Sequence, residues 1–165
     1  MTPPPLPETI LALPKAELHL HLEGSIQPAT VCALTARHGV RMSQEEVRQR
    51  YAYRNFSEFI EAFKWVTSYL REPRDYALIA TDLAEYLLAQ NVLYTEVTLS
   101  IGVMLLRKQR PERNFEAMLE ATAPFERRGL RFRWVFDAAR QFGVEAAMEV
   151  VSAARNCHSK DIVAF

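Results

Sequence analysis

Apolar and polar positions repeat along this 165-residue chain with two different periods, which alternate from one segment to the next. Apolar residues recur at every second position, or form short β-branched and aromatic runs, near residues 16–23, 91–99, 130–138 and 161–165, and this pattern predicts strands. Helical spacing fills the intervals between them. Strands that alternate with helices predict an α/β fold built on a parallel sheet.

The interval between the first two predicted strands is much longer than one crossover helix requires. A helix is expected over residues 29–38, ending before Gly39, and a Ser43–Glu46 capping box predicts the start of a second helix. A third begins near Ser57, and residues 74–90 supply the crossover helix. Residues 29–72 are therefore predicted to be a helical insertion, whose aromatic residues either pack internally or form an apolar lid.

The first predicted strand carries chemical side chains at alternate positions. Residues 14–24 read PKAELHLHLEG, so a regular strand would place three leucines on one face and the remaining side chains, Glu17, His19, His21 and Glu23, on the other. Two imidazoles at i and i+2 can converge on one zinc ion. A bare His-x-His pair also occurs on solvated strand faces, so the spacing alone leaves both interpretations open.

Three segments carry a resemblance to a known family. Residues 14–26, PKAELHLHLEGSI, resemble the first-strand motif of the adenosine deaminase family of metal-dependent amidohydrolases. Residues 91–100 and 131–140 are similar to its second- and third-strand segments. The resemblance implies that residues 1–165 form a partial hydrolase barrel: the N-terminal half of a (β/α)8 TIM barrel, with a helical insertion after strand 1.

The resemblance also implies a function: zinc-dependent hydrolytic deamination of a small-molecule aminopurine nucleoside such as adenosine or aminodeoxyfutalosine, with release of ammonia. His19 and His21 match the family's first two ligands of a single Zn²⁺ ion. Glu23 matches a substrate-binding position at which the best-known adenosine deaminases have aspartate. The family's general acid and base belong to the second half of the barrel, so no catalytic residue is assigned here and the chain alone is expected to be inactive.

Other functions remain open at this stage. The same motif would suit an adenine deaminase or another barrel amidohydrolase acting on a different bond. A half-barrel that serves as an interaction module and has no catalytic activity is a further alternative. Residues 98–105, TLSIGVML, are most similar to the aminodeoxyfutalosine branch and favour a nucleoside of that type.

Composition and charge narrow the range of partners. The 20 basic and 20 acidic residues cancel, and no long basic tract favours nucleic acid. The basic cluster at residues 107–110 is expected at a solvated helix end. No apolar run is long enough to span a membrane and no signal peptide is recognised, so a cytoplasmic protein is expected. Prolines at positions 3–5 and 7 predict an extended arm.

Three further polar side chains remain to be interpreted. Glu96, on the second predicted strand, is either a buried structural carboxylate, paired with an arginine or hydrogen-bonded behind the site, or an acid or base beside the metal. His38 and His158 are separated in the sequence from other ligand types and are expected to be surface or helix-end residues.

Overall fold

The computed structural model describes residues 8–165, so the extended arm predicted for residues 3–7 lies outside the described residues. Its strands are β1 (Lys15–His21), β2 (Val92–Leu99), β3 (Arg131–Phe136) and β4 (Ile162–Ala164). The α-helices and the two short 3-10 helices are α1 (Glu8–Ala12), η1 (Leu22–Gly24), α2 (Pro28–Arg37), α3 (Gln44–Tyr51), α4 (Phe56–Thr67), α5 (Pro73–Ala89), α6 (Ile101–Leu106), α7 (Pro111–Glu126), η2 (Arg140–Phe142) and α8 (Gly143–Asn156).

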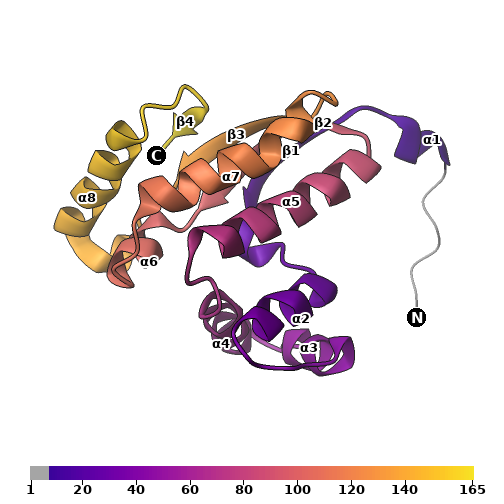
Figure 1. Ribbon diagram of the computed structural model, residues 1–165, viewed down its shortest axis with the longest axis horizontal. Coiled ribbons are helices and arrows are strands. Elements are labelled where there is room, and N and C mark those ends of the chain that lie inside the picture. Colours follow the sequence, from indigo (N-terminus) through magenta and orange to yellow (C-terminus); the bar gives the residue numbers. More distant parts are fainter. Residues whose placement is uncertain (1–7) are drawn as a thin grey trace.

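The four strands form one parallel sheet in the order β1-β2-β3-β4, which is also their order in the chain (Figure 1). A helix connects each strand to the next, as in successive βα units of a barrel. The predicted α/β fold is confirmed: the chain has the architecture of the first half of a (β/α)8 barrel. The carboxyl ends of the strands, where barrel enzymes build their active sites, lie at one edge of this sheet.

One face of the sheet is covered by α5 and α7, which lie side by side in Figure 1. Every second residue of β3 is buried against them: Phe132, Trp134 and Phe136. Phe115 of α7 makes edge-on contacts with the rings of Trp134 and Phe136, with centroids 5.7 and 5.2 Å apart. This aromatic layer forms the centre of the core. The opposite face of the sheet is therefore available for a functional site.

The residues between β1 and β2 form α2, α3 and α4, which lie together below the sheet in Figure 1, followed by the crossover helix α5. The Ser43–Glu46 capping box forms as predicted: the Glu46 backbone N–H donates to Ser43 Oγ and the Ser43 N–H donates to Glu46 Oε2. Helix α6 was not predicted, because its six residues are apolar throughout and have no helical periodicity. Among residues 8–165, no helix combines the length and hydropathy that a bilayer span requires.

Strand β1 departs from the regular strand that the sequence predicts. It ends at His21, so Leu22 and Glu23, placed in the predicted strand 16–23, instead belong to the 3-10 turn η1. In the ladder with β2, Glu17 lies beside Thr95 and Leu20 beside Val97, so three steps of β1 match two steps of β2. This bulge changes the alternation, and Glu17 does not share the face of His21.

Candidate metal and substrate site

The two histidines of β1 lie next to each other. Their ring centroids are 5.4 Å apart and the ring planes meet at 68°. His19 is exposed and His21 is half-buried. His19 lies within the bulge of β1, and its φ of 62° lies in the left-handed region that a residue with a Cβ rarely adopts.

The spacing of the rings fits a shared zinc ion. Imidazole nitrogens lie about 2.0–2.1 Å from zinc, and a tetrahedral angle between two such ligands separates the ring centroids by about 5 Å. The observed 5.4 Å agrees with that value. This ring separation is therefore compatible with one ion shared by His19 and His21.

The histidines line a cavity of about 410 Å³ at the carboxyl end of the sheet, on the face opposite α5 and α7. Its other polar lining residues are Glu96 and Thr98 of β2 and Asp137, which follows β3. Glu96 accepts a hydrogen bond from the hydroxyl of Tyr94 at 2.8 Å and has no arginine partner among residues 8–165, so of the two structural roles considered it has the hydrogen-bonded one. The sheet thus brings two carboxylates to the histidines, one on β2 and one directly after β3.

Glu23 lies at the same end of the sheet but is buried, with 3% of its surface exposed. Its Oε1 accepts a hydrogen bond from the backbone N–H of Ser100 at 2.9 Å, whereas Oε2 is buried without a partner among the described residues. Burial raises the pKa of this carboxyl group, and the hydrogen bond from Ser100 opposes the shift. An unsatisfied buried carboxylate oxygen in a native fold calls for a partner, and a ligand can supply one.

A small cavity of about 70 Å³ adjoins Glu23. Apart from Gly24 at its rim, it is lined by residues of α3, α4 and the loop between them: Tyr51, Tyr53, Phe59, Ala62, Phe63 and Val66. The Tyr51 hydroxyl donates to the Ile26 carbonyl at 3.1 Å, and burial raises the pKa of Tyr51 to about 12. The insertion therefore forms an apolar wall beside the carboxylate, which agrees with both packing and a lid.

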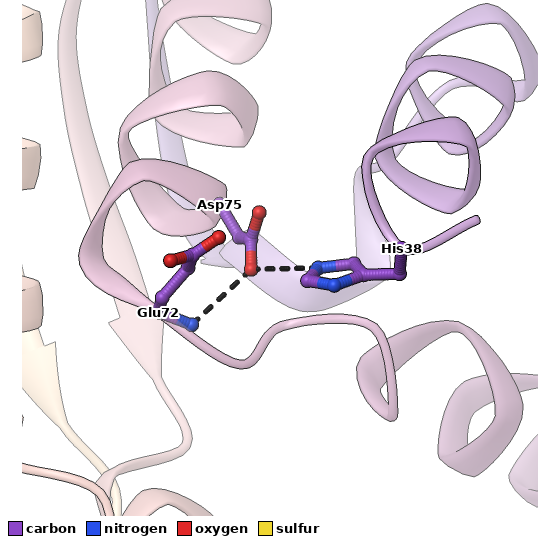
Figure 2. Close-up of side chains that lie close together, drawn as sticks. All are labelled: His38, Glu72 and Asp75. Atoms are coloured by element: carbon purple, nitrogen blue, oxygen red, sulfur yellow. Dashed lines mark hydrogen bonds and ion pairs between the residues drawn. The ribbon is translucent and has the colours of Figure 1, made fainter.

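A different group of candidate ligands lies outside this site. His38 Nε2 is 3.0 Å from Asp75 Oδ2, and Glu72 lies beside them (Figure 2). The expectation that His38 is isolated from other ligand types is wrong. Asp75 Oδ2 also accepts hydrogen bonds from the backbone N–H groups of Arg71 and Glu72, at 3.0 and 3.2 Å. These bonds cap the start of α5, so the cluster connects the end of α2 to α5.

Comparison with known proteins identifies relatives of this site. Residues 14–165 match the model of the family described as adenosine deaminase. An aminodeoxyfutalosine deaminase from Streptomyces avermitilis is 35% identical over 150 residues, which cover 86% of this chain and 41% of that protein. An adenine deaminase from Paraburkholderia phytofirmans is 28% identical over 90% of this chain and 43% of that protein. The chain therefore spans less than half the length of these relatives.

Solved structures agree with the fold. An adenine deaminase from Arthrobacter aurescens superposes with a TM-score of 0.81 at 25% identity, over 90% of this chain and 46% of that one. An amidohydrolase from Burkholderia ambifaria, crystallised with bound Zn, gives a TM-score of 0.82 at 22% identity, over 95% of this chain and 44% of that one. Because the family model covers nearly all described residues, the chain belongs to the adenosine deaminase family.

Proposed function

We propose that this chain supplies the N-terminal half of the active site of a zinc-dependent deaminase that hydrolyses the amino group from an aminopurine. The observation that supports the proposal most directly is the pair of imidazoles of His19 and His21, 5.4 Å apart over a cavity that also contains Glu96 and Asp137. Zinc would act as a Lewis acid that activates water at neutral pH. His19 and His21 would hold that ion in their neutral forms.

Glu23 is proposed to bind the substrate. Its Oε1 is fixed by the Ser100 backbone N–H, so Oε2 faces no competing protein group and can bond a hydroxyl or amino group of the purine compound. The aromatic wall of Tyr53, Phe59 and Phe63 would exclude water on that side. General acid and base groups would come from residues outside this chain.

The relatives support two substrate classes. The 35% identical relative is named an aminodeoxyfutalosine deaminase, and this name agrees with the branch that residues 98–105 favour. The Arthrobacter structure and the Paraburkholderia relative are named adenine deaminases. We propose an aminodeoxyfutalosine-type nucleoside as the substrate, with adenine as the second candidate.

A split-barrel experiment tests the activity. The 165-residue chain would be co-expressed with the C-terminal half of the Streptomyces avermitilis relative, and ammonia release measured from adenine, adenosine and aminodeoxyfutalosine. We expect release from at least one compound, abolished by His19→Ala together with His21→Ala and unchanged by His158→Ala, which alters an exposed loop histidine.

The relative's own N-terminal half serves as the positive control. If that half restores activity while this chain assembles with the same partner and releases no ammonia from any of the three compounds, the proposal is wrong. Zinc binding by the chain gives a separate measurement, since the double histidine variant should lose it and the His158→Ala variant should keep it.

A further inference from the structure

A second large cavity, of about 440 Å³, lies between the loop that joins α4 to α5 and the loop that joins α6 to α7. Five of its lining residues are basic: Arg71, Arg107, Lys108, Arg110 and Arg113. Glu72 is the one acidic residue in the lining, and it is paired with Arg74 outside it. Arg71 is far from residues 107–113 in the sequence, so the order of charges along the chain does not show that these basic residues lie around one cavity.

These five cations lack counter-ions. Among residues 8–165, the ion pairs formed by other basic residues include none with a lining arginine or with Lys108. Like charges held around one cavity repel each other, and an anion placed among them removes that repulsion. Lys108 also has a φ of 57°, a conformation that favours glycine, so the chain holds a lysine where the backbone does not favour one.

Of the two helix N-termini near the cavity, that of α7 adds to the positive potential. Figure 1 shows the first turns of α5 and α7 at the same end of the molecule, beside α6 and above α4. The carboxylate of Asp75 caps the start of α5, but no side chain caps α7, which begins after Arg110. Pro111 has no N–H group and the N–H of Arg113 donates to the Arg110 carbonyl, so only the Glu112 N–H of this first turn is left for an anion.

The floor of the cavity is built from connected hydrogen bonds. Gln109 Oε1 accepts from the Tyr76 hydroxyl at 2.9 Å and from Asn114 Nδ2 at 3.1 Å. Its Nε2 donates to the Leu70 carbonyl at 2.6 Å, which joins the two loops. Asn114 is 3% exposed and Tyr76 is 2% exposed. The shape of the cavity is thus set by buried groups before any ligand arrives.

We propose that this cavity is an anion site for a small molecule carrying at least two phosphate charges. Arginine forks and lysine ammonium groups both suit phosphate oxygens, and the volume falls within the range of about 300–1,000 Å³ that small-molecule sites occupy. The cavity shares no lining residue with the cavities at His19 and at Glu23. The inference is therefore independent of the proposed deaminase activity.

Calorimetric titration of the 165-residue chain with inorganic pyrophosphate tests the site. We expect one equivalent to bind, and the double variant Arg110→Gln, Arg113→Gln to weaken the affinity about tenfold or more. The control is Arg127→Gln with Arg155→Gln, two exposed arginines outside the cavity, which changes the net charge equally and should alter the affinity less than twofold.

Lys108→Gly provides a variant that retains the fold, because it removes a cavity charge at a position where glycine relieves backbone strain. It should also weaken pyrophosphate binding. A parallel titration with ADP distinguishes the source of the phosphate: tighter binding than pyrophosphate indicates a nucleoside phosphate, and equal binding indicates a free phosphate compound. Equal losses in the cavity and control variants, or no binding of either compound at millimolar concentration, would overturn the proposal.

Discussion

His19 combines a proposed role in metal binding with an unfavourable backbone conformation. Its φ of 62° costs a residue with a Cβ about 1–2 kcal/mol. His21, two residues later, has an ordinary extended conformation with φ −87°. The same substitution should therefore have opposite effects on stability at these two neighbouring positions.

We predict that His19→Gly is more stable than His19→Ala by about 1 kcal/mol, because glycine adopts positive φ without strain. At His21 the order should be reversed, with His21→Ala more stable than His21→Gly. Urea unfolding of the four variants measures both differences. If alanine is the more stable residue at both positions, His19 does not have the conformation described.

Glu23 allows a second comparison at the scale of one residue. Glu23→Gln keeps an acceptor for the buried N–H of Ser100, whereas Glu23→Ala leaves that group unsatisfied and opens a cavity. We predict that Glu23→Ala destabilises the fold by about 1–3 kcal/mol more than Glu23→Gln does. Unfolding free energies give the comparison, with Glu116→Ala, at an exposed position of α7, as the control expected to have little effect.

At the scale of elements, the hydrophobic pattern and the capping residues predict helices and strands, but they do not predict how neighbouring strands pair. The alternation in β2 is found as expected, with Val97 and Leu99 buried in the core and Glu96 and Thr98 lining the cavity with the histidines. The β1 bulge could not be predicted, because it depends on how the strand matches β2, and the local pattern of leucine and histidine is perfectly regular. The contact of His38 with Asp75 joins residues 37 positions apart, and local sequence patterns do not predict contacts between residues so far apart.

Asp75 stabilises the junction between α2 and α5 through three contacts of one oxygen, to His38 and to two backbone N–H groups. We predict that Asp75→Ala lowers the free energy of unfolding by about 2–4 kcal/mol, because the helix loses its cap and the groups that bond Asp75 Oδ2 lose their acceptor. Glu85→Ala, at an exposed position on the same helix, should change it little. Equal effects of the two substitutions in urea unfolding would contradict this role.

The capping box of α3 predicts a pH dependence. Hydrogen bonds from the Ser43 backbone N–H and hydroxyl lower the pKa of Glu46 below its usual 4.5. A lowered pKa in the folded state stabilises the fold above pH 4.5, and this stabilisation is lost as the pH falls through the folded value. Wild type should therefore be more stable than Glu46→Gln at pH 7, and the difference should shrink on acidification. A constant difference in unfolding midpoints would refute the assignment.

On the scale of the whole molecule, the first-strand motif together with the second- and third-strand segments predicted the half-barrel and the family. They could not predict the basic cavity, which forms only when residues 71 and 107–113 are brought together by the packing of α5 against α7. The residues that complete the zinc site and transfer protons are expected outside this chain. The proposed zinc site therefore takes two histidines from this chain, whereas a catalytic zinc needs three ligands from the protein.

We accordingly predict that the purified 165-residue chain, loaded with zinc, releases no ammonia from adenosine, adenine or aminodeoxyfutalosine. A coupled assay for ammonia, with a full-length deaminase as the positive control, makes the measurement. Turnover that survives removal of His19 and His21 would indicate a contaminant. Turnover that depends on these histidines would mean that residues 1–165 contain a complete active site.

The ladder between β1 and β2 has two irregularities that cancel. From Lys15 to Ala16 the partner position advances from Val92 to Tyr94, and between Glu17 and Leu20 the surplus residue lies on β1. A one-residue slip confined to positions 16–19 would join Lys15–Val92 to Leu20–Val97 in an unbroken ladder without moving either end. In that register Ala16 and Glu17 would each pair one position earlier on β2, and His19 would lie beside Glu96 on the face of His21.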